Sequence, residues 1–139
     1  DAPIFASVDV TADGMLASGR GTLAEAAAVM ADLGASVAGF ATLADPTAAE
    51  RLADGAREAL AAQGADLSLM ASLVVAERDP RQQGPTAENP YYAPDTMLAA
   101  AGALRSAGVQ FLRAAGDATP AYTGVLAAAT AGQDVVAEV

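Results

Sequence analysis

The spacing of apolar residues alternates between that of a strand and that of a helix. Residues 3–10 (PIFASVDV) alternate in part between apolar and polar side chains and predict a strand. From Leu23 to Leu33 the apolar residues recur every three or four positions, which predicts an amphipathic helix. Thr22 and Glu25 have the spacing of a capping box at its start, and Gly34 is placed to end it. These residues predict one strand–helix unit.

The same order then repeats. Further strands are predicted at residues 36–41, 67–75 and 109–114. The helices between and after them begin at Asp45-Pro46, at Pro94 and at Thr119-Pro120, and they end at Gly64, Gly108 and Gly132. Val135 and Val136 fit a possible fifth strand. The pattern predicts one α/β domain over residues 1–139, with four βα units.

The strands read as buried on both faces, which is typical of a parallel sheet with right-handed crossovers. In such sheets, function lies in the loops that follow the carboxyl ends of the strands. These loops are Thr11–Gly21, Thr42–Ala44, Ala76–Ala93 and Ala115–Ala118. The third is long for a plain connection, so we expect it to contribute to a site.

Composition excludes several kinds of chemistry. The chain has 17 acidic residues against 7 arginines, a net charge of −10, and no Lys, Cys or His. Such a charge repels phosphate backbones, so we expect no nucleic-acid partner. Without Cys and His there is no thiolate and no imidazole, which removes the usual zinc ligands and the usual general base. No stretch approaches the roughly 20 apolar residues that span a bilayer, and there is no signal-peptide pattern, so we expect a cytoplasmic protein without a membrane partner.

Two long stretches resemble a known family. Residues 4–47 (IFASVDVTADGMLASGRGTLAEAAAVMADLGASVAGFATLADPT) and 89–126 (NPYYAPDTMLAAAGALRSAGVQFLRAAGDATPAYTGVL) are similar, in order, to parts of the homocysteine S-methyltransferases, which include betaine–homocysteine methyltransferase. The resemblance implies the last four βα units of a zinc-dependent (β/α)8 barrel that transfers a methyl group to homocysteine sulfur. It also places the family's three zinc cysteines at Thr42, Ala115 and Gly116, none of which offers a thiolate. We therefore expect no zinc or other cofactor and no catalytic residue.

Two architectures fit these patterns. The first is half of a TIM-type (β/α)8 barrel, which would expose two strand edges and so should form a homo-oligomer or pair with an N-terminal half-barrel. The second is a doubly wound three-layer sheet, which a chain of this length could form alone.

Five residues are candidates for ligand binding: Asp9, Thr42, Tyr91, Tyr92 and Arg113. The two tyrosines lie beside Asn89 in the long loop, where their rings could line a pocket or pack over the end of the sheet. Arg113 is predicted near the strand's carboxyl end, where it could bind a carboxylate or, as we favour, pair with Asp117.

Two further groups are weaker candidates. Residues 19–22 (GRGT) precede a helix and could hold an anion. The loop acids Asp9, Asp13, Glu77, Asp79 and Asp117 could hold a hard cation, although solvated carboxylates are the simpler interpretation.

Three functions remain open. The first is a homocysteine S-methyltransferase-like domain or fragment that lacks zinc and is not catalytic alone. The second is a non-catalytic module that binds a small amino acid or thioether. The third is an unrelated enzyme that uses loop carboxylates.

Overall fold

A computed structural model describes residues 2–131. Its elements follow in the order β1 (Phe5–Asp9), α1 (Leu23–Asp32), β2 (Val37–Thr42), α2 (Pro46–Ala62), β3 (Ser68–Val75), a 3-10 turn (Pro94–Thr96), α3 (Met97–Ser106), β4 (Phe111–Gly116) and α4 (Pro120–Thr130). The α/β class and the alternation of strands and helices are confirmed. The possible strand at Val135 and Val136 lies outside the described residues.

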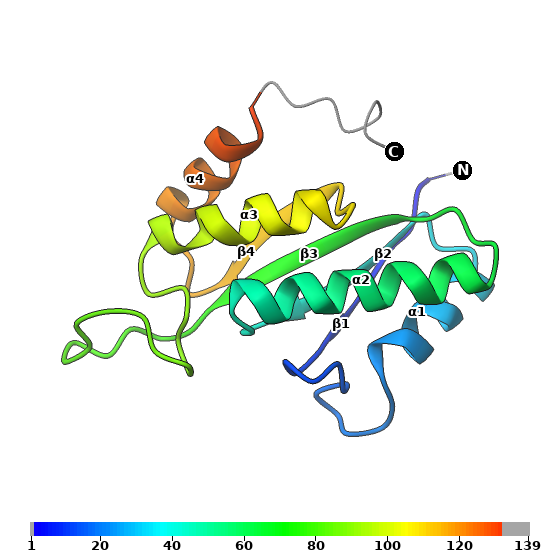
Figure 1. Cartoon of the computed structure of the whole chain (residues 1–139), viewed down its shortest axis with the longest axis horizontal. Helices are drawn as coiled ribbons and strands as arrows, with labels where there is room; N and C mark the ends of the chain where they lie inside the picture. Colours follow the sequence, from blue (N-terminus) through cyan, green and yellow to red (C-terminus); the bar gives the residue numbers. More distant parts are fainter. Residues whose placement is uncertain (1, 132–139) are drawn as a thin grey trace.

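The strands form one parallel sheet in the order β1-β2-β3-β4. Consecutive helices pack against one another, and Figure 1 shows them side by side along the sheet. A doubly wound sheet needs a reversal of strand order and helices on both faces. The described strands have no such reversal, so the three-layer alternative does not fit.

Local capping explains where the first two helices begin. The Thr22 hydroxyl accepts a hydrogen bond from the Glu25 N–H at 3.2 Å, and Asp45 Oδ1 accepts one from the Ala48 N–H at 2.9 Å. Each bond satisfies a backbone donor that the helix itself leaves free. Both predicted caps are confirmed.

The fourth strand begins two residues later than predicted. The Val109 N–H donates to Leu104 O at 3.0 Å, so this residue belongs to the end of α3, and its apolar side chain is fully buried there. β4 consequently extends to Gly116 and includes Ala115, both of which were expected in the following loop.

The helices cover one face of the sheet. Ala6 and Val8 of β1 pack against the hydrophobic core, whereas the alternate residues of this strand, Phe5, Ser7 and Asp9, are exposed. Alternate residues of a strand point to opposite faces. Phe5, Ser7 and Asp9 therefore mark the face opposite the helices, which we call the open face.

The open face is concave. The rings of Phe5 on β1 and Phe111 on β4 meet edge to face, with 5.4 Å between their centroids. In a flat sheet these two strands lie about 14 Å apart, and their side chains stand parallel. The contact therefore requires the outer strands to tilt toward each other. Between them, Met70 fills the space above Gly39, because a Cβ on that glycine would lie 2.8 Å from Met70 Cε.

No helix among residues 2–131 is both long enough and apolar enough to cross a membrane.

The aromatic contact across the open face gives a test of its curvature. We expect the double-mutant cycle Phe5→Ala, Phe111→Ala to show a coupling of about 0.5–1.5 kcal/mol in the free energy of unfolding, because each single variant already removes the ring pair. Urea denaturation of the four proteins measures it. Additive effects of the two substitutions would mean that the rings do not meet in solution.

Candidate functional site

The carboxyl ends of β1 and β2 border a pocket that contains two of the predicted ligand residues. We call it the strand-end pocket. Its volume is about 630 Å³, and Asp9, Thr42, Val74 and Glu88 contribute to its lining together with mostly small apolar residues of the adjoining loops. This pocket has carboxylates but no arginine, so nothing in it balances the charge of a ligand carboxylate.

The three positions that resemble the family's zinc cysteines do not converge. Thr42 is in register with Leu73 and through it with Ala114, whereas Ala115 is in register with Val74. Successive residues of a strand face opposite sides, so Thr42 and Ala115 point to different faces of the sheet. The Thr42 hydroxyl is also engaged, because it accepts a hydrogen bond from the Ala44 N–H at 3.1 Å.

Gly116 has a backbone that excludes a side chain. Its φ of +68° is one that L-residues rarely adopt, and a Cβ there would lie 2.5 Å from Val75 O and 2.9 Å from Val74 Cγ1. A cysteine at this position requires the end of β4 to move.

Tyr91 is a core residue rather than the predicted wall of a pocket. Its side chain is fully buried, and its hydroxyl donates to Ala44 O at 2.7 Å. This bond joins the long loop to the β2–α2 loop. Burial, followed by the charge of Asp45, raises the pKa of the Tyr91 hydroxyl above its ordinary range. In the described structure Tyr91 has no exposed surface, and its ring packs in the core.

Tyr122 holds the same loop from the other side. Its hydroxyl lies 2.9 Å from Tyr91 O and 3.0 Å from Tyr92 O, the two carbonyls to which it donates. Burial raises the pKa of this hydroxyl as well. Tyr122 could not be recognised from sequence alone, because it lies within a helix, 31 residues from its partner. The third tyrosine thus ties α4 to the long loop.

Tyr92 and Arg78 form a pair within the loop. The Arg78 guanidinium donates to the Tyr92 hydroxyl at 2.9 Å and lies 4.6 Å from the centre of its ring. The Tyr92 hydroxyl in turn donates to Gln82 O at 2.9 Å. Unlike Tyr91, Tyr92 reaches a pocket, and ligand contact there stays a prediction.

This second pocket lies between the long loop, the ends of β3 and β4 and the start of α4. We call it the loop pocket. Its volume is about 500 Å³, and its polar lining consists of Arg78, Asn89, Tyr92, Asp117, Thr119 and Tyr122. Asn89 is 6% exposed. Its Oδ1 is the only buried side-chain nitrogen or oxygen atom without a hydrogen-bond partner among residues 2–131. One signal in the sequence pointed to Asn89, an amide close to two tyrosines.

Arg113 lies apart from both pockets. It borders a groove along the outer edge of β4, together with Arg105, Gln110 and residues of α4. The favoured ion pair between Arg113 and Asp117 does not form. Within residues 2–131 the only ion pair joins Arg57 and Asp54. The strand register aligns Arg113 with Ser72, Ala41 and Asp9 across the sheet. Arg113 and Asp9 therefore lie at opposite edges of the sheet.

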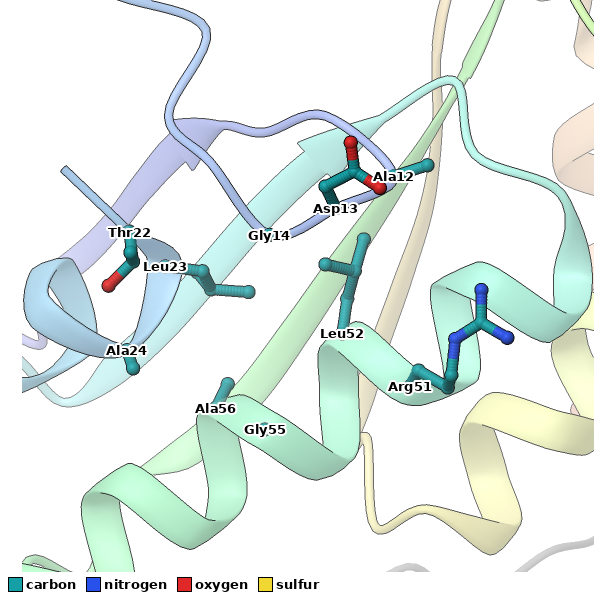
Figure 2. Close-up of a pocket in the computed structure, with 10 residues that line it drawn as sticks. All are labelled: Ala12, Asp13, Gly14, Thr22, Leu23, Ala24, Arg51, Leu52, Gly55 and Ala56. Atoms are coloured by element: carbon teal, nitrogen blue, oxygen red, sulfur yellow. The ribbon is translucent and has the colours of Figure 1, made fainter. Parts of the chain in front are cut away.

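The GRGT segment does not leave an open anion site. Thr22 caps α1, and a Cβ on Gly21 would lie 3.1 Å from Glu25 Oε2, so a carboxylate already stands near the helix start. A groove of about 440 Å³ lies beside it, in which Figure 2 shows Leu23 of α1 and Leu52 of α2. This groove is mainly apolar and lacks convergent polar groups.

The loop acids do not assemble a cation site. No three Asp, Glu, His or Cys side chains within residues 2–131 are grouped so that they could hold a metal ion.

Comparison with known protein families gives no match, and no curated protein sequence is significantly similar to this chain.

The buried tyrosine gives the second prediction. Tyr91→Phe leaves the Ala44 carbonyl without its donor, so we expect a loss of about 1–3 kcal/mol in the free energy of unfolding at neutral pH. Tyr92→Phe is the matched control and should cost less, because its partners lie in a more exposed part of the loop. Urea denaturation measures both.

The pH dependence of the same variant provides an independent readout. The folded protein raises the pKa of Tyr91, so its contribution is complete below about pH 10, the unfolded value, and is lost as the pH rises beyond it. Wild type should therefore lose stability above that pH more steeply than Tyr91→Phe. Parallel curves for the two proteins would show that Tyr91 is not buried as described.

Proposed function

We propose that this chain is a homocysteine S-methyltransferase-like half-barrel that binds a small amino acid or thioether at its carboxyl-end rim and is not catalytic alone. The observation that carries the proposal is the pair of pockets at that rim. Both lie at the carboxyl ends of parallel strands, where α/β folds place their ligand sites.

The curvature of the sheet supports the half-barrel. In an eight-stranded barrel the interior is just wide enough for inward side chains to meet. The Phe5–Phe111 contact joins strands at the two edges of the sheet, as side chains across such an interior would. β4 also begins two residues further along than its neighbours, since Phe111 is in register with Met70, the third residue of β3. Stagger between strands is what barrel closure requires.

The zinc positions argue against methyl transfer by this chain alone. The Thr42 hydroxyl already accepts a hydrogen bond, and Gly116 has no room for a side chain. These positions therefore provide no set of donors for zinc. Without a metal-bound thiolate, homocysteine sulfur is not activated in the way the family resemblance implies.

The lining of the strand-end pocket supports the ligand class. Val74, Leu43 and several alanines offer an apolar wall that suits a thioether chain.

Ligand binding without zinc is the third prediction. We expect isothermal titration calorimetry to detect binding of L-methionine and L-homocysteine, with affinities that are unchanged after dialysis against a chelator. Glucose serves as the control and should give no heat of binding. Affinity that disappears with the chelator, together with one zinc per chain by elemental analysis, would contradict the proposal.

Pairing between half-barrels is part of the same proposal. The outer edges of β1 and β4 carry backbone groups that no strand within residues 2–131 pairs, and Phe5 and Phe111 are 50% and 42% exposed. A partner strand on each edge would satisfy those groups and cover the rings. A second copy of the chain and an N-terminal half-barrel both offer such strands.

Self-association of the isolated chain is the fourth prediction. Analytical ultracentrifugation at micromolar concentration should show a dimer or larger species, and a charged residue in place of Phe111 should shift it toward the monomer. Leu33→Glu is the matched control, because Leu33 is 78% exposed at the C-cap of α1 and belongs to neither outer strand. A wild-type chain that sediments as a monomer would contradict pairing between copies of the chain.

A further inference from the structure

We propose that the loop pocket is the site that holds the charged head of an α-amino acid. The ammonium group lies at Asn89 and Asp117, and the carboxylate lies between Arg78 and the N-terminus of α4. The assignment rests on the proposed function for its ligand class and adds the location and the residues.

The first observation is the unpaired oxygen of Asn89. This side chain lines the loop pocket, is 6% exposed, and has no donor for its Oδ1. Leaving a buried acceptor unpaired costs free energy, and such groups are uncommon in folded proteins. A ligand that brings an N–H to this oxygen removes that cost.

The orientation of the amide is fixed by its neighbours. Asn89 Nδ2 donates to Gln82 Oε1 at 3.1 Å, and Gln82 Nε2 donates to Gly84 O at 2.6 Å. The Gly84 carbonyl can only accept, so Gln82 must present its oxygen to Asn89, and Asn89 must present its nitrogen to Gln82. These hydrogen bonds therefore fix which atom of the Asn89 amide is unpaired, and that atom is the oxygen.

The second observation is positive charge in the lining of the same pocket. α4 starts there, and the side chain of its N-cap residue, Thr119, makes no capping hydrogen bond. The N-terminus of a helix attracts anions. Arg78 adds a full positive charge, and its bond to Tyr92 uses one of its five N–H donors.

These groups together select a ligand with both charges. A simple carboxylic acid leaves the Asn89 oxygen unpaired, and a simple amine leaves the start of α4 without an anion. An α-amino acid satisfies both ends, and Asp117 adds a negative charge for its ammonium group. The strand-end pocket cannot replace this site, because it has no positive side chain.

The wild-type protein tests the assignment directly. Calorimetry should compare L-methionine with its analogue without the amino group, 4-(methylthio)butanoate, and with its analogue without the carboxylate, 3-(methylthio)propylamine. We expect each analogue to bind more weakly than methionine by about tenfold or more, because each loses one charged contact. Equal affinity for methionine and either analogue would overturn the assignment.

A variant pair then locates the site. Asn89→Leu keeps the approximate size of the side chain and removes the amide, and it should weaken methionine binding about tenfold while the affinity for 4-(methylthio)butanoate stays the same. Gln83→Leu, an exposed amide of the same loop, is the matched control and should bind methionine as wild type does. Thermal melting of each variant shows whether it is folded.

The outcomes separate this inference from the proposed function. Methionine binding that is lost in Asp9→Asn but kept in Asn89→Leu would place the head group in the strand-end pocket, which overturns the inference and leaves the proposed function intact. Absence of methionine and homocysteine binding in the wild type would overturn both.

Discussion

Parallel pairing of strands in chain order is the constraint on which the rest of this structure depends. When each strand pairs with the one before it, connections of the same hand return along the same side, and the helices gather on one face. Within residues 2–131 the opposite face then has no helical layer. Its residues are covered only to the extent that the sheet curves and its own side chains meet, as Phe5 and Phe111 do.

The long loop shows how few aromatic residues can organise a chain whose core is largely alanine. Tyr91 reaches the β2–α2 loop, and Tyr122 reaches back from α4 to the two carbonyls at Tyr91 and Tyr92. Each hydroxyl binds a backbone acceptor that lies far away in sequence. The loop is therefore held at two places, and its residues contribute to the lining of both rim pockets.

Local signals carried most of the fold prediction, and distant contacts account for most of what it missed. Thr22 and Asp45 could be recognised as caps because their partners lie three residues away. The start of β4 was misplaced because Val109 looks like a strand residue, and only its hydrogen bond to Leu104 assigns it to the helix end. The same limit applies to the site. Tyr91 and Tyr92 are neighbours in sequence, yet one is core and the other borders a pocket, and the free oxygen of Asn89 depends on Gln82 and Gly84.

The close approach at Gly116 has a consequence for any redesign of this fold. A side chain at that residue must displace the carbonyl of Val75, a backbone atom that cannot rotate away. Sulfur ligands cannot therefore be placed at the end of β4 by exchanging side chains one by one. The backbone has to change first, and until it does each intermediate sequence is strained and has no metal to stabilise it. A metal site designed at this end of the sheet therefore needs a new backbone path before single substitutions can supply its ligands.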